Sequence, residues 1–124
     1  MNRTGMKLLA ALLVPLAAWA GNAERGKAIA TGNAEASCVL CHAIPGVNAA
    51  AGNIGPSLAG VGARLRPDEL RQRIVDASRI NPKTVMPPYG RTQGLYQVAA
   101  PYRGKPLLTD KQIDDVVAFL LTLK

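Results

Sequence analysis

The chain has 124 residues, which is enough for one domain, and its 15 lysine and arginine residues exceed its 8 aspartate and glutamate residues, for a formal charge of +7. Removal of the first twenty residues takes away Arg3 and Lys7 and leaves 13 basic against 8 acidic side chains. Because the arginines are not interleaved with aromatic residues, this balance argues against a nucleic-acid partner and favours an acidic protein surface.

Residues 1–20 have the pattern of a secretory signal peptide. Arg3 and Lys7 make a basic start, and an apolar run from residue 8 ends in an Ala-Trp-Ala cleavage box at residue 20. The alternative is an uncleaved membrane anchor, but the run is shorter than the ~20 apolar residues of a span and Pro15 interrupts it. The sequence therefore predicts export to the periplasm and a single mature domain over 21–124. No second apolar run follows, so we expect no membrane contact after cleavage.

The first half of this domain predicts one helix and a long loop. Asn22 is a suitable N-cap for a helix that runs to about Thr31, where Gly32 and Asn33 form a stop signal. A second, short helical stretch is expected to begin just before the cysteines. The segment 43–62 is rich in glycine, proline, alanine and asparagine and predicts a long irregular loop, of the kind that is usually functional or wrapped round a ligand.

The second half predicts two helices separated by another irregular segment. A helix over about 67–78 begins with Pro67 at its first position and carries an apolar stripe of Leu70, Ile74 and Ala77. Asn-Pro at 81–82 ends it, and three prolines keep the following stretch irregular. The last helix starts at a capping box of Thr109 and Gln112, and its apolar face comprises Ile113, Val116, Val117, Leu120 and Leu123. No strand pattern occurs, so the predicted fold is all-α with two long ordered loops.

Both cysteines and the only histidine lie within five positions, as Cys38-x-x-Cys41-His42. A disulfide across two residues would stabilise little, zinc lacks the further ligands of a structural site, and a thioredoxin-like dithiol needs a βαβ context. C-x-x-C-H is the attachment pattern of c-type haem, in which the two thiols bind the porphyrin and the imidazole binds the iron. We therefore expect one covalently attached haem c, with Cys38 and Cys41 as its anchors and His42 as the proximal iron ligand.

Met86 is the only methionine that remains after residues 1–20 are removed, and two prolines follow it. Thioether sulfur stabilises ferrous iron and raises the reduction potential, and prolines stiffen the loop that presents it. We therefore expect Met86 to be the distal iron ligand. The alternative is that Met86 packs within its loop while the iron is open or bound by lysine.

With these motifs the chain resembles a class I cytochrome c over nearly all of residues 21–124. The resemblance implies that the first and last helices cross beside the haem, with Gly26 at the close contact and Phe119 against it. It further implies that the Pro56 carbonyl accepts the N–H of the proximal imidazole and that Arg64 approaches a haem propionate. For Arg64 the alternative is an ordinary solvated arginine.

The finer resemblance is to SoxX, the monohaem cytochrome of the thiosulfate-oxidising Sox system. It is carried by residues 52–90, which include Asn-Pro-x-Thr-x-Met-Pro-Pro, by Val98 and Tyr102, and by the last helix. The resemblance implies a SoxA-like haem subunit as partner, a SoxYZ-like carrier reached through the complex, and a downstream electron-acceptor cytochrome. The complex is an L-cysteine S-thiosulfotransferase whose catalytic haem lies on SoxA, so the expected role of this chain is electron transfer. The segment before the cysteines is brief and offers little of the extra binding surface that some members have.

Two other functions compete with this hypothesis. A free-standing cytochrome c that serves another oxidase or reductase would have the same haem chemistry. A ligand-binding or peroxidase-like haem protein would need an open distal position and a distal acid or base, and residues 21–124 contain no second histidine. The arginines at 64–73 are a possible steering patch for an acidic partner, although such runs are more often solvated helix faces.

Overall fold

A computed structural model describes residues 21–32, 36–47 and 52–124. The predicted signal peptide and Asn33 lie outside these ranges, as do residues 48–51 of the first loop. The described part contains helices and no strand, which confirms the all-α class. In order, the elements are α1 (Ala23–Thr31), the 3₁₀ helix η1 (Cys38–Leu40), α2 (Val61–Arg64), α3 (Pro67–Asp76), the 3₁₀ helices η2 (Ala77–Arg79) and η3 (Ala100–Tyr102), and α4 (Asp110–Leu120).

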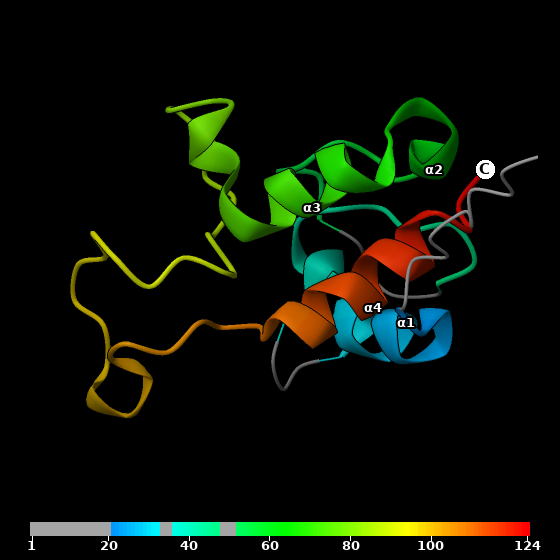
Figure 1. Ribbon diagram of the computed structural model, residues 1–124. Helices are drawn as coiled ribbons and strands as arrows, with labels where there is room; N and C mark the ends of the chain where they lie inside the picture. The colour runs from blue at the N-terminus through cyan, green and yellow to red at the C-terminus, as the bar shows by residue number, and fades with distance from the viewer. Residues whose placement is uncertain (1–20, 33–35, 48–51) are drawn as a thin grey trace, which may run out of the picture.

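Helices α1 and α4 cross and make the most extensive contact between any two elements, while α3 packs on α4 from another side (Figure 1). A Cβ atom on Gly26 would lie 1.9 Å from the Asp115 carbonyl oxygen, so only glycine allows this approach. A Cβ atom on Gly21 would likewise lie 2.0 Å from the Asp114 carbonyl oxygen. Phe119 is buried on α4. The expected crossing of the first and last helices is therefore confirmed, and glycine sets its distance at two points.

The buried carboxylate of Asp115, on α4, binds the start of α1. The Asn22 N–H donates to Asp115 Oδ1 at 2.6 Å, and Arg25 Nε donates to Asp115 Oδ2 at 3.1 Å. Burial by itself raises the pKa of Asp115, but these hydrogen bonds, with the charges of Arg25 and Lys111, hold it below its ordinary value. Asn22 also caps α1 as expected, since its side chain accepts from the Arg25 N–H.

The predicted helix over 67–78 is found, with Pro67 in its first turn and Leu70, Ile74 and Ala77 buried. Its last turn differs from the prediction because α3 ends at Asp76 and continues as η2. The Asp76 carboxylate accepts from the backbone N–H and the hydroxyl of Ser78 and so caps the next turn. The hydroxyl bond is the main cause of the lowered pKa of Asp76, and the charges of Arg91 and Arg79 add to it.

Two short helices interrupt the segments that were expected to be irregular. Helix α2 begins at Val61, inside the end of the predicted loop, after Gly60 turns the chain with a φ of 67°. Helix η3 is a single turn in the second loop. The predicted capping box of Thr109 and Gln112 is present at the start of α4. The helix ends at Leu120, and the end of the chain instead secures α2 through a hydrogen bond from Lys124 Nζ to the Gly62 carbonyl at 2.9 Å.

Candidate functional site

A cavity of about 600 Å³ lies between η1, α3, α4 and the loop after η2. Its volume is within the range of about 300–1,000 Å³ that is usual for cofactor and small-molecule sites. Much of its wall is apolar and comes from buried core residues such as Leu70, Ile74 and Leu120. All six residues proposed from the sequence line this one cavity, namely Cys38, Cys41, His42, Pro56, Arg64 and Met86.

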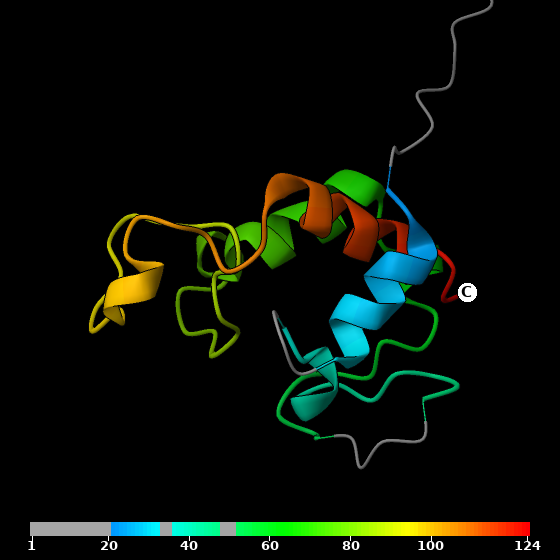
Figure 2. The ribbon, with the colours of Figure 1, turned by 90° about the horizontal axis from the view of Figure 1, so that it is seen from below.

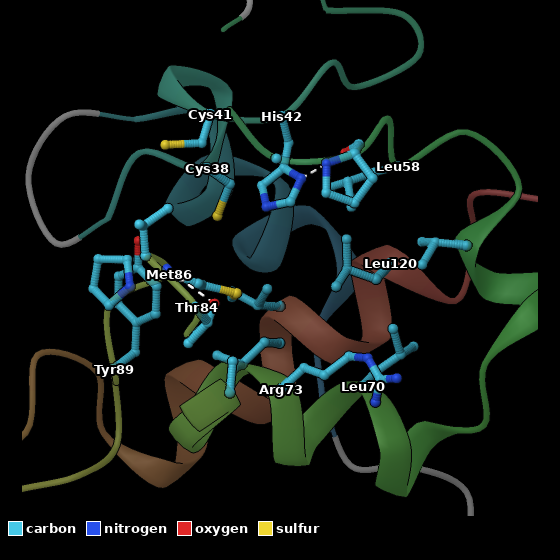
Figure 3. Close-up of a pocket in the computed structure, with 18 of the residues that line it drawn as sticks. Cys38, Cys41, His42, Leu58, Leu70, Arg73, Thr84, Met86, Tyr89 and Leu120 are labelled. Carbon is cyan, nitrogen blue, oxygen red and sulfur yellow. Dashed lines mark hydrogen bonds between the residues drawn. The ribbon is translucent and has the colours of Figure 1, made fainter. Parts of the chain in front are cut away.

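The cysteine cluster forms one tight turn at the cavity wall. The N–H groups of Cys41 and His42 donate to the Cys38 carbonyl at 3.1 and 2.9 Å. This turn brings the Cys38 sulfur and the His42 ring to the same side of the cavity (Figure 3). The two thiols are free rather than joined in a disulfide. Burial raises the pKa of the Cys38 thiol, and the nearby Cys41 adds to the rise, so Cys38 is not a reactive thiolate at neutral pH.

His42 is held by a backbone carbonyl, as the resemblance implied. His42 Nδ1 lies 2.6 Å from the Pro56 carbonyl oxygen, to which it donates, and this leaves the Nε2 lone pair free as a metal ligand. Gly55 also lies directly against the ring, where a Cβ atom would be 2.4 Å from His42 Cε1. The Gly55 N–H also donates to the Cys41 carbonyl at 2.8 Å, which ties this loop to the cysteine turn. Sequence analysis did not single out Gly55.

Met86 lies on the wall opposite the cysteine turn. Its sulfur points into the cavity on the side that faces the His42 ring (Figure 3). The Met86 N–H donates to the Thr84 hydroxyl at 3.1 Å, and the Thr84 N–H donates to the Asn81 carbonyl at 3.0 Å. The neighbouring Val85 is 77% exposed, whereas Met86 is half-buried against the core. The Asn81 turn thus directs Met86 inward, whereas Val85 lies at the exposed edge of the cavity.

Two arginines reach the cavity from different helices. Arg64 lies at the end of α2, where its guanidinium donates to the Ala59 carbonyl at 2.5 Å. Arg73, on α3, lines the cavity and is half-buried. In the sequence, Arg73 stands out only as one member of a charged run. Its spacing on the Leu70 and Ile74 stripe was the signal that places it on the inner face of the helix.

Tyr89 is a further cavity residue that sequence analysis did not assign. Its N–H donates to the Ile74 carbonyl at 3.2 Å, and its carbonyl accepts from the Leu108 N–H at 2.9 Å. Burial raises the pKa of the Tyr89 phenol, and the nearby Cys38 and Cys41 thiols add to the rise. Tyr89 therefore joins the loop after Met86 to the end of α3 and to the segment before α4.

Within the described ranges, no helix is long and apolar enough to cross a membrane. In the same ranges, no three His, Cys, Asp or Glu side chains gather as a group that could hold a metal ion. The metal-binding atom that the cysteine turn offers is Nε2 of His42, the one histidine of the chain.

Comparison with known proteins identifies relatives for this fold and site. The cytochrome c family model matches residues 23–124, a range that includes the C-x-x-C-H motif. A chain of the crystal structure of SoxXA from P. pantotrophus matches at 38% sequence identity and a TM-score of 0.73, over 84% of this chain and 82% of that chain. A search of curated proteins found no match. The chain belongs to the cytochrome c family, which carries covalently bound haem c and transfers electrons, and within it this is a class I cytochrome c that resembles SoxX.

Proposed function

We propose that the protein is the periplasmic, SoxX-like electron-transfer subunit of a complex with a SoxA-like partner. The observation that supports electron transfer is that His42 and Met86 lie on opposite walls of one apolar cavity, beside the cysteine turn. A free-standing cytochrome would share this pair, so the choice of a SoxX-like role rests on the similarity to a chain of SoxXA. Such a pair would fill both axial positions of the iron and leave no open position for a substrate. Catalysis would then belong to the partner, where thiosulfate is coupled oxidatively to a cysteine of a SoxYZ-like carrier. The likeness to a chain of SoxXA supports the choice of partner.

The residues of the cavity fit a covalently held haem c. Cys38 and Cys41, one turn apart on the cavity wall, would form the two thioethers. Haem supplies an iron that gains and loses one electron. The guanidinium groups of Arg64 and Arg73 are the cations of the cavity wall on α2 and α3, and they would pair with the propionates.

The two side chains that would bind the iron are held in place by nearby residues of the chain. The Pro56 carbonyl fixes the tautomer of His42, so that Nδ1 carries the proton and Nε2 is the ligand. On the other wall, the Thr84 hydroxyl holds the backbone of Met86, and two prolines follow at 87 and 88. Little rearrangement is then needed between the two oxidation states, and small rearrangement is what rapid electron transfer requires.

The Met86 assignment is tested by the near-infrared absorption band that methionine gives when it binds ferric haem iron. We expect the oxidised holoprotein to show this band and Met86→Ala to lose it. Val85→Ala is the matched control, because Val85 is the exposed neighbour and should leave the band unchanged. If Met86→Ala keeps the band, another residue is the distal ligand and the assignment is wrong.

The partner assignment is tested by co-expression with a SoxA-like subunit, followed by addition of thiosulfate and the carrier protein. We expect a stable heterodimer in which the haem of this chain is reduced when both are present. The control omits the carrier, since the electrons are released only when thiosulfate is joined to its cysteine. A monomeric cytochrome that is indifferent to thiosulfate would instead support the free-standing electron shuttle.

A further inference from the structure

The segment Arg91–Leu107, here called the arm, projects from the body of the protein in both views (Figures 1 and 2). Its base is fixed on both sides, by the Gly90 N–H bond to the Val75 carbonyl at 3.1 Å and by Leu108, which is 2% exposed. Within the described residues, the ion pair that joins the arm to the body is Arg91 with Asp76, at 3.6 Å. The arm is therefore a projection on a rigid base.

The arm is ordered by its own backbone rather than by a core. The N–H groups of Tyr102 and Lys105 donate to the carbonyls of Ala99 and Tyr102 at 2.9 and 3.1 Å. Arg103 Nε donates to the Val98 carbonyl at 3.3 Å. Side chains on such a frame have a defined direction before any partner arrives, which lowers the entropy cost of binding.

The arm exposes side chains that usually lie in interfaces. Tyr96 is 93% exposed, Tyr102 56% and Leu107 45%. A single exposed apolar residue is ordinary, but tyrosine and arginine are the residues most enriched at the energetic centres of protein interfaces. Here two tyrosines and Arg103 share one projecting segment.

The positive charge of the arm and of the segment before it indicates which kind of partner would bind there. Residues 77–109 contain five basic side chains and no aspartate or glutamate. On the arm, Arg103 and Lys105 follow the exposed Tyr102 in the chain, and neither has a carboxylate partner among the described residues. A second copy of the chain would bring the same positive surface against itself, so the complementary occupant is a protein that presents carboxylates.

The arm also connects to the site. Tyr89 and Leu108, which pair at its base, both line the cavity, as do the exposed Ile80 and Val85. A protein seated on the arm would therefore lie against the wall that holds Met86, a short way from the expected electron carrier.

We infer that the arm is the docking element for the haem-bearing partner subunit, which meets it with carboxylates around an apolar patch. This inference rests on the proposed function, because it assigns the surface at which the proposed partner sits. Docking buries Tyr96 and Tyr102, pairs Arg103 and Lys105 with the carboxylates, and weakens as salt rises.

The test measures the dissociation constant of the holoprotein with a SoxA-like subunit, at low and at physiological salt. The double variants Tyr96→Ser/Tyr102→Ser and Arg103→Glu/Lys105→Glu should each weaken binding by about tenfold or more. Lys27→Glu, a charge reversal on the exposed side of α1, should leave it unchanged. The arm side chains are exposed, and the one side-chain hydrogen bond that the substituted residues make within the described part of the chain is the exposed bond from Arg103 to the Val98 carbonyl, so the urea unfolding midpoints of the variants should stay close to that of the wild type.

The outcomes separate the two proposals. If the unmodified proteins do not bind, the proposed function fails and this docking partner fails with it. If they bind and both arm variants bind equally well, the arm is not the docking element, while the proposed function stands. If the complex is insensitive to salt and the Arg103→Glu/Lys105→Glu variant forms it normally, the partner does not bind through carboxylates and this part of the inference is wrong. Arm-dependent dimers of this chain alone, seen by sedimentation, would make a second copy the occupant and overturn the inference.

Discussion

Replacing Gly55 with alanine tests how tightly the fold holds the His42 imidazole. The added Cβ atom would lie 2.4 Å from His42 Cε1, and an ordinary contact begins at 3.4 Å, so the ring has to move by 1.0 Å. If that movement lengthens the 2.6 Å bond between His42 Nδ1 and the Pro56 carbonyl to 3.6 Å, the hydrogen bond is lost. Such a bond contributes about 1 kcal/mol.

The consequence is measurable as the pH at which acid releases His42 from haem iron. Protonation of the imidazole competes with the iron, so a histidine that is held less firmly is released with less acid and the midpoint rises. One pH unit corresponds to about 1.36 kcal/mol, so the loss of about 1 kcal/mol predicts a rise of about 0.7 unit. The assay is an acid titration of the main haem absorption band, with far-UV circular dichroism recorded in parallel to separate ligand release from unfolding.

Gly46→Ala is the matched control. Gly46 has a φ of 75° and no atom within 4 Å of its Cβ position, so alanine there strains the backbone without touching the ring. We expect Gly46→Ala to lose about 1 kcal/mol of stability and to keep the acid midpoint of the wild type. An unchanged midpoint in Gly55→Ala, or an equal rise in both variants, would refute the reasoning.

Three other substitutions test the frame around the site. Gly26→Ala places a Cβ atom 1.9 Å from the Asp115 carbonyl oxygen. Although alanine has the better helix propensity, this substitution should lower the free energy of unfolding, measured in urea, by about 2 kcal/mol. Lys27→Ala is the control and should leave the free energy of unfolding unchanged. The pKa of Asp115 is lowered by its hydrogen bonds, so its contribution is present above the ordinary value of about 3.9 and is lost as pH falls through the folded pKa. Urea titrations should therefore show stability falling below about pH 4, and a shallower fall in Asp115→Asn, whereas equal slopes would show that Asp115 is not the group responsible. Thr84→Val removes the acceptor of the Met86 N–H, and the near-infrared band should then vanish at a lower temperature than in the wild type.

The fold was predictable where a side chain acts on its own backbone neighbours. Asn22 and the Thr109–Gln112 pair mark the starts of α1 and α4, and the structure has both caps. Helix α2 was not predictable, because four residues are too few to show a period and the turn depends on the positive φ of Gly60. The end of α3 at Asp76 was also missed, because whether an aspartate caps a new turn depends on the backbone that follows it.

The residues of the candidate site were likewise predictable only in part. The cysteine turn is contiguous in sequence, so its pattern is visible without a structure. Met86 could be predicted as a ligand because it is the one methionine after residue 20, and the structure places it in the same cavity as the cysteine turn. Gly55, Arg73 and Tyr89 were not assigned, because each matters through a contact with a segment distant in sequence or through the direction of its helix face. A single sequence does not contain such tertiary information.

The buried Asp115 also sets how far the chain can be shortened from its N-terminus without loss of stability. Its carboxylate uses the backbone N–H of Asn22, and the adjacent Gly21 packs without a side chain against Asp114. A cut after Ala20 leaves both contacts whole, whereas a cut only two residues later removes a donor from a buried negative charge, at a cost of about 1–3 kcal/mol. Cleavage at the predicted position would therefore leave the contacts of Asp115 intact, and trimming beyond it is a route to instability.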